Sequence, residues 1–189
     1  METHERQLVV DQFNSSEARL EELVKGLSAD QWTFREAPDR WSIAEVIEHV
    51  IAVEERITRR IAKILEGPGE PEKRAGAAGK DALVQSRGTD RSSKFNAPEP
   101  VRPTGKYESA ELMAEFRKTR ERTMAFVGQL QSDLRNHFIP HPVFGDLDCY
   151  QWLLLLGKHG DRHALQIEEI KANKGYPVGY PGETAAAKA

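Results

Sequence analysis

Three histidines are the residues whose type and spacing best suit chemistry in this chain. His159 and His163 lie four residues apart in the last long segment with helical periodicity. Side chains at positions i and i+4 of a helix lie on one face, so two imidazoles placed in this way can bind one cation. His49, on an earlier helical segment, would supply a third ligand. Three histidine ligands leave coordination positions for water or substrate, as catalytic zinc sites do.

The face of the helix that carries the histidine pair favours this interpretation. At about 100° per residue, His159 and His163 fall within the apolar face, and the charged residues of the segment lie on the other side. A core-facing imidazole loses water and needs a partner. A shared metal is the more economical explanation, and side-chain hydrogen bonds are the alternative. The apolar face consists of Trp152, Leu153, Leu156, Gly160, Ile167 and Ile170.

The other candidate groups are weaker. His4 lies near the terminus, and His137 and His141 lie in a proline-containing loop before the last helix, where polar surface residues are expected. Cys149 lies in the first turn of that helix, where the macrodipole can lower the pKa of a thiol. No motif supplies a base or an oxyanion site for it, so we expect an incidental cysteine. Glu45, one turn before His49, would either orient that ring or cap its helix.

Composition narrows the class of protein. The chain has 189 residues, with 30% charged and 39% apolar residues, as expected for one globular domain. The net charge of −3 gives no support for a nucleic-acid partner. One cysteine excludes an intrachain disulfide and favours a reducing compartment. We find no apolar run long enough for a membrane span and no signal sequence, and therefore expect a cytoplasmic protein without a membrane partner.

Four long amphipathic patterns predict the fold. Apolar residues recur at helical spacing, and capping-box sequences precede several of the segments. No strand pattern or internal repeat is evident, so the expected fold is all-α, a four-helix bundle. A capping box at residues 28–31 also predicts a short helical turn. The predicted long helices cover about residues 3–27, 42–66, 109–130 and 148–172.

Two further segments complete the predicted domain, residues 1–175. Residues 67–107 are rich in glycine, proline, alanine and charge, and would form a long crossover between the second and third helices. A structureless stretch of this length is unusual inside a domain, so it is either a surface loop or partly disordered. A short helix is predicted at about residues 81–85. Residues 176–189 are predicted to form a C-terminal tail.

Two stretches of the sequence resemble the DinB-like superfamily of metal-dependent enzymes. One is residues 41–49 (WSIAEVIEH), which is similar to the tryptophan-serine start of the family's second helix. The other is residues 141–147 (HPVFGDL), followed by Trp152 and residues 159–167 (HGDRHALQI), which is similar to the family's closing signature. The resemblance extends over nearly the whole chain, from about Glu5 to Lys174.

The resemblance implies a fold of DinB-like type, with an unusual long crossover between helices two and three. It implies that His49, His159 and His163 bind one divalent metal, with nickel or zinc as the candidates. It also implies a homodimer, and a small-molecule substrate. Better understood branches transfer low-molecular-weight thiols such as bacillithiol or use mycothiol in isomerisation, and other members are described as metal-dependent hydrolases. The 67–107 segment is longer than expected for the family. It would cover or narrow the pocket beside the metal.

The leading functional hypothesis is therefore a metal-dependent, thiol S-transferase-like enzyme. The three imidazoles would hold the cation, and a thiol or water beside it would become the nucleophile. A metal-dependent hydrolase is the first alternative. A non-catalytic metal-binding or stress-response bundle is the second, and it predicts a fourth protein ligand. The remaining alternative is a helical bundle without a metal.

Overall fold

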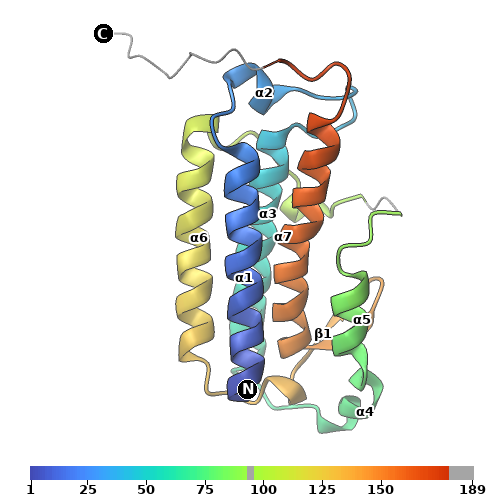
Figure 1. Ribbon diagram of the computed structural model, residues 1–189. Coiled ribbons are helices and arrows are strands. Elements are labelled where there is room, and N and C mark those ends of the chain that lie inside the picture. Colours follow the sequence, from blue (N-terminus) through green and yellow to red (C-terminus); the bar gives the residue numbers. More distant parts are fainter. Residues whose placement is uncertain (93–95, 179–189) are drawn as a thin grey trace.

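The computed structural model describes residues 1–92 and 96–178, and within these ranges four long helices form a bundle (Figure 1). α1 packs on α6 and α7, and α3 packs on the same two helices, so α1 and α3 occupy opposite corners. α1 and α7 run in one direction, and α3 and α6 run in the other (Figure 1). The predicted four-helix bundle is confirmed. The long helices are α1 (Thr3–Val24), α3 (Ile43–Ile64), α6 (Ser109–Gln129) and α7 (Cys149–Lys171).

Side-chain caps begin the helices that carry the three histidines. At α3 the Ser42 hydroxyl accepts the N–H of Glu45, and the Glu45 carboxylate accepts the N–H of Ser42. Asp148 and Gln151 form the same reciprocal pair at α7. The short helix α2 (Ala29–Thr33) also begins with the predicted capping box. Each cap contributes about 0.5–2 kcal/mol to stability. It also sets the residue at which its helix begins, and therefore where along the helix the histidines lie.

The connection from α3 to α6 follows the length of the bundle, because α3 ends at one end and α6 begins at the other (Figure 1). Its longest helix packs on α7 and includes the helix predicted at residues 81–85. The crossover is thus partly helical, and residues 93–95 lie outside the described ranges. Its elements are η1 (Pro71–Lys73), α4 (Arg74–Ala77), α5 (Lys80–Arg87) and η2 (Glu99–Val101).

A small antiparallel hairpin lies before α7, and here the sequence-based expectation of no strand was wrong. β1 (Phe138–His141) pairs with β2 (Gly145–Asp148), with Ile139 opposite Leu147. Both of these side chains are fully buried, whereas Gly145 has a φ of 67° at the turn. Strands of four residues are too short to show a period-two pattern, and a proline in one of them argues against a strand. The turn η3 (Leu134–Asn136) joins α6 to this hairpin.

Close contact between α1 and α7 places α7 in the bundle. A Cβ atom at Gly157 would lie 2.9 Å from Cβ of Gln12, and one at Gly160 would lie 2.9 Å from Cβ of Ser16. Two glycines three residues apart thus let the helix backbones approach on the face next to the histidine pair. Beyond α7, the Tyr176 ring packs edge-on against the ring of Phe34, the residue that follows α2. Residues 179–189 of the predicted tail lie outside the described ranges.

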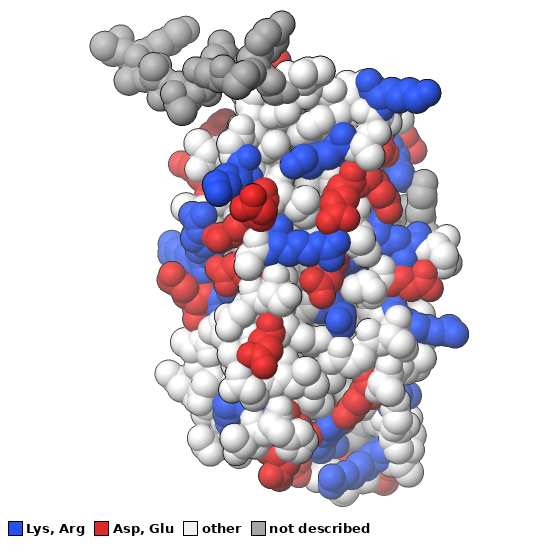
Figure 2. Space-filling view, viewed as in Figure 1, with Lys and Arg blue, Asp and Glu red and all other residues white. Residues whose placement is uncertain are grey.

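Charged side chains of both signs are interspersed on the face shown in Figure 2. Several form exposed pairs between helices, such as Arg19 with Glu168 and Arg117 with Glu21. Exposed pairs of this kind contribute about 0–1 kcal/mol each. Among the described residues, no helix combines the length and the apolarity needed to cross a membrane.

Candidate metal centre

The fold brings the three predicted ligands together. His49 comes from α3, and His159 and His163 come from consecutive turns of α7. The ring centroids are 5.2 Å apart for His49 and His159, 4.9 Å for His49 and His163, and 4.4 Å for His159 and His163. One nitrogen from each ring lies within 4.8 Å of the others. His49 and His163 are each only 6% exposed, and His159 is partly exposed.

A backbone carbonyl from the crossover determines how the His49 ring is protonated. Nδ1 of His49 lies 2.7 Å from the carbonyl oxygen of Val101. Since a carbonyl only accepts hydrogen bonds, Nδ1 carries the proton in the neutral ring and Nε2 has the free lone pair. The Trp41 ring packs on the same imidazole, with centroids 4.8 Å apart. This arrangement is the usual one for a metal-binding histidine, whose other nitrogen donates to a carbonyl or carboxylate.

Gln166 holds the His163 ring in a similar way. Nδ1 of His163 lies 2.9 Å from Oε1 of Gln166, and Nη1 of Arg91 donates to the same oxygen at 3.4 Å. Because Arg91 can only donate, the Gln166 atom that accepts its hydrogen bond is the amide oxygen. Nδ1 of His163 therefore donates to this oxygen, and Nε2 of His163 has the lone pair. Nε2 of His163 lies 3.1 Å from Nε2 of His159. Two nitrogens about 2.1 Å from one cation, at 90–109° to each other, would be about 3.0–3.4 Å apart.

Loss of water lowers the pKa of all three imidazoles and so favours their neutral form. Loss of water lowers the pKa of His159 well below its ordinary value, and repulsion from His163 and His49 lowers it further. The pKa of His163 is likewise well below its ordinary value, through burial and repulsion from His49. Burial also lowers the pKa of His49, although the hydrogen bond to Val101 opposes the shift. Neutral imidazole is the form that binds metals, and it suits zinc, copper, iron and nickel.

Glu45 and His137 have other partners. The Glu45 carboxylate accepts the Ser42 N–H and pairs with Arg35 at 2.7 Å, so its capping role accounts for it. His137 was predicted as a surface residue, and this was wrong, because the side chain is buried. Its ring nitrogens face the carbonyls of Asp133, at 2.7 Å, and Gly67, at 3.1 Å, and join the hairpin to the start of the crossover.

His141 and Cys149 have structural environments. Nδ1 of His141 accepts the N–H groups of Val143 and Phe144, which shapes the hairpin turn, and burial lowers its pKa to about 4. The Cys149 side chain is fully buried, and its pKa is raised to about 12 by burial and by the charge of Asp148. The thiolate needed for nucleophilic chemistry is therefore disfavoured. This environment favours the interpretation of Cys149 as incidental.

Sequence reasoning missed the residues that orient the ligands. The Val101 carbonyl belongs to the backbone, so no side-chain type signals it. Gln166 lies three residues after His163 on one helix, and that spacing could have identified it. Glu48 is also buried, and it binds the segment that contains Val101. Burial would raise the pKa of the Glu48 carboxyl, but hydrogen bonds from Thr104 and its neighbours lower it overall.

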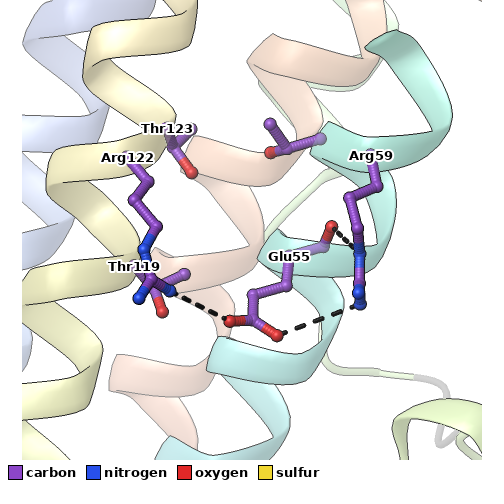
Figure 3. A pocket seen from close by; sticks show the side chains of 6 residues that line it. Glu55, Arg59, Thr119, Arg122 and Thr123 are labelled. Carbon is purple, nitrogen blue, oxygen red and sulfur yellow. Dashed lines mark hydrogen bonds and ion pairs between the residues drawn. The ribbon is translucent and has the colours of Figure 1, made fainter. Parts of the chain in front are cut away.

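A separate cavity of about 260 Å³ lies between α3 and α6 (Figure 3). The Glu55 carboxylate points between Arg59 and Arg122, at 3.9 and 3.5 Å (Figure 3). A carboxylate already paired with two guanidinium groups is a poor metal ligand. The histidine cluster, which does not line this cavity, is therefore the better candidate site. The cavity is lined by Glu55, Thr58, Arg59, Thr119, Arg122 and Thr123.

Comparisons with known proteins agree with the topology. Residues 12–167 match the family model of the DinB superfamily. The uncharacterized protein YuaE of Bacillus subtilis strain 168 is 31% identical over 159 residues, which cover 82% of this chain and 94% of the relative. The solved structure of YfiT from Bacillus subtilis is described as a probable metal-dependent hydrolase with an unusual four-helix bundle topology. It aligns with a TM-score of 0.58 at 15% identity, over 90% of this chain and 88% of YfiT.

Proposed function

The chain belongs to the DinB superfamily, and from that premise we propose that it is a divalent-metal-dependent enzyme that transfers a thiol to an electrophilic small molecule. The observation that carries the proposal is the convergence of three imidazoles whose neutral form is favoured, from α3 and α7; two of them are buried and His159 is partly exposed. Nickel and zinc are the proposed ions, and a bacillithiol-type thiol is the proposed co-substrate.

The residues of the chain have distinct roles in this proposal. His49, His159 and His163 would hold the cation through ring nitrogens. Val101 and Gln166 would keep two of the rings in the tautomer that leaves Nε2 free. A divalent cation there supplies a positive charge that makes a nearby thiol or water more acidic. Three protein ligands would leave positions for exogenous groups, as in catalytic sites.

The absence of a carboxylate in the cluster favours a thiol over water as the nucleophile. Among the described residues, the group that could hold a metal contains only the three histidines. A thiol loses its proton far more easily than water does, so it depends less on a positioned general base than hydrolysis does. Glu48, the buried carboxylate next to His49, is already engaged by backbone N–H groups.

Hydrolysis is the second candidate, and the description of YfiT as a probable metal-dependent hydrolase supports it. Water would then take the place of the thiol. The non-catalytic alternative predicted a fourth protein ligand, and the cluster in the described residues has three. We also propose a homodimer, by analogy with the family, and a cytoplasmic location, where the single thiol of Cys149 would stay reduced.

An activity assay separates the two enzymatic candidates. The protein would be loaded with nickel or zinc and mixed with an electrophilic test substrate, with and without bacillithiol. Turnover that needs both the thiol and the ion, and that is lost in His163→Ala, would support the transferase. Turnover by water alone would refute the transferase version and support the hydrolase. Thiol consumption at the same rate in His163→Ala would refute both.

A further inference from the structure

Glu48 is a buried carboxylate that binds a single segment of the crossover. It is 7% exposed, and its partners are three consecutive residues. Oε1 accepts the N–H of Thr104 at 2.8 Å, the hydroxyl of Thr104 at 2.9 Å and the N–H of Lys106 at 3.4 Å. Oε2 accepts the N–H of Gly105 at 2.9 Å. A buried carboxylate with this many donors is strongly tied to them, because each bond is charge-assisted.

The same segment contains the carbonyl that binds His49. We call residues 101–106 the strap. At one end of the strap the Val101 carbonyl accepts the Nδ1–H of His49, and at the other end residues 104–106 bind Glu48. His49 and Glu48 are neighbours on α3, and η2 packs on that helix. The strap is therefore held to α3 by two side chains, those of His49 and Glu48. His49 is a candidate metal ligand, and Glu48 is not.

The position of the strap decides which nitrogen of His49 has the lone pair. With the Val101 carbonyl at 2.7 Å, a proton on Nδ1 is stabilised by a buried hydrogen bond. Without that carbonyl, a neutral imidazole populates both tautomers, and part of the population has its proton on Nε2. A proton on Nε2 blocks the nitrogen that must bind the cation. The ring would also lose the contact that fixes its orientation.

We propose that Glu48 is a positioning residue for His49: it anchors the strap so that the Val101 carbonyl selects the Nδ1–H tautomer. The relevance of this role to a metal rests on the proposed function. The tautomer itself is a property of the metal-free protein and can be measured without any ion. Partners that orient a metal ligand typically affect metal affinity 10–100-fold when they are removed.

The first test compares three proteins by ¹⁵N NMR of their histidine rings in the absence of metal. Glu48→Ala removes the anchor. Glu45→Ala is the matched control, because Glu45 lies one turn earlier on α3 and caps the helix without bonding to the strap. We expect His49 to be the Nδ1–H tautomer in the wild type and in Glu45→Ala, and a mixture of tautomers in Glu48→Ala. An unchanged Nδ1–H tautomer in Glu48→Ala would overturn the proposal.

The second test measures the affinity of the same proteins for Zn²⁺ and Ni²⁺ by competition with a chelator, together with their thermal stability. We expect binding to Glu48→Ala to be about 10–100-fold weaker and binding to Glu45→Ala to change less than about twofold, although both lose stability. Reduced stability in Glu48→Ala with wild-type affinity would show a purely structural role and overturn the proposal. A wild type that binds neither ion would refute the proposed function, while the tautomer would still decide the role of Glu48.

Two milder variants keep the test available if Glu48→Ala does not fold. Glu48→Gln retains the Oε1 acceptor but presents an amide NH₂ to the N–H of Gly105, and Thr104→Val removes the hydroxyl donor alone. Each change removes one of the bonds that hold the strap. We expect a smaller shift of the His49 tautomer in the same direction for both. No shift in either variant would overturn the proposal.

Discussion

The ion pair between Arg120 and Glu54 is the most consequential charged contact in the core, and breaking it should destabilise the bundle strongly. Arg120 on α6 is 1% exposed and Glu54 on α3 is 3% exposed. The guanidinium donates to both carboxylate oxygens, at 3.1 and 3.0 Å, and to the hydroxyl of Ser16 on α1 at 3.1 Å. It also lies against the rings of Phe13 and Phe116. The pair therefore joins α1, α3 and α6.

Arg120→Met keeps most of the buried side-chain volume but leaves the Glu54 carboxylate without its partner. Leaving one member of a buried pair uncompensated costs about 3–5 kcal/mol in the free energy of unfolding. For a chain of this size that corresponds to a fall in Tm of roughly 6–20 °C. The double variant Arg120→Met/Glu54→Leu removes both charges and should recover most of the loss, because replacing a buried pair by apolar residues is often close to neutral.

Urea unfolding followed by circular dichroism measures these free energies, with the m-value as a check that the denatured state is unchanged. Arg122→Met on the same helix is the matched control, because Arg122 is mostly exposed and its ion pairs should contribute little. A loss below about 1 kcal/mol in Arg120→Met, or a double variant as unstable as the single, would refute this reasoning.

Three other predictions concern the packing and the buried titratable groups. Gly160→Ala should destabilise the protein by about 1–3 kcal/mol, because its Cβ would lie 2.9 Å from Cβ of Ser16. Gly128→Ala, whose Cβ would meet no side chain within 4 Å, should be neutral or stabilising in the same urea titration. The folded pKa of His141 is about 4, below the ordinary value of 6.5, so its contribution to stability should be present above pH 6.5 and lost as the pH falls toward 4. As the pH falls below 6.5, the urea midpoint should therefore fall less steeply in His141→Gln than in the wild type. An equal dependence on pH in the two proteins would count against the lowered pKa of His141. Cys149 should resist a thiol reagent in the native protein and react after unfolding, and rapid native labelling would contradict its burial.

Local sequence signals predicted the bundle well. The capping boxes at Ser42 and Asp148 and the apolar stripes depend on residues close together in the chain, and the structure confirms both. The hairpin was missed because its strands have four residues each and β1 contains Pro140. The folded crossover was only partly predicted, because α4 and η2 lack a periodic pattern long enough to recognise.

Residue spacing predicted the pair of candidate ligands that share a helix, and the resemblance to the DinB-like superfamily added His49 from another helix. The spacing of His159 and His163 places them on one face, and the fold brings His49 next to them. The groups that orient the rings were not predictable, because Val101 acts through a backbone carbonyl from a segment 52 residues away. Such contacts depend on how the crossover lies against α3, which no local pattern specifies.

The metal content of the untagged protein shows most directly whether the three histidines bind an ion. Elemental analysis would be run on the wild type and on the His159→Ala/His163→Ala double variant, before and after incubation with nickel and zinc. We expect about one divalent ion per chain in the wild type and its loss in the variant, because both rings would contribute ligands to one cation. No bound ion in the wild type after incubation, or an equal amount in the variant, would contradict it.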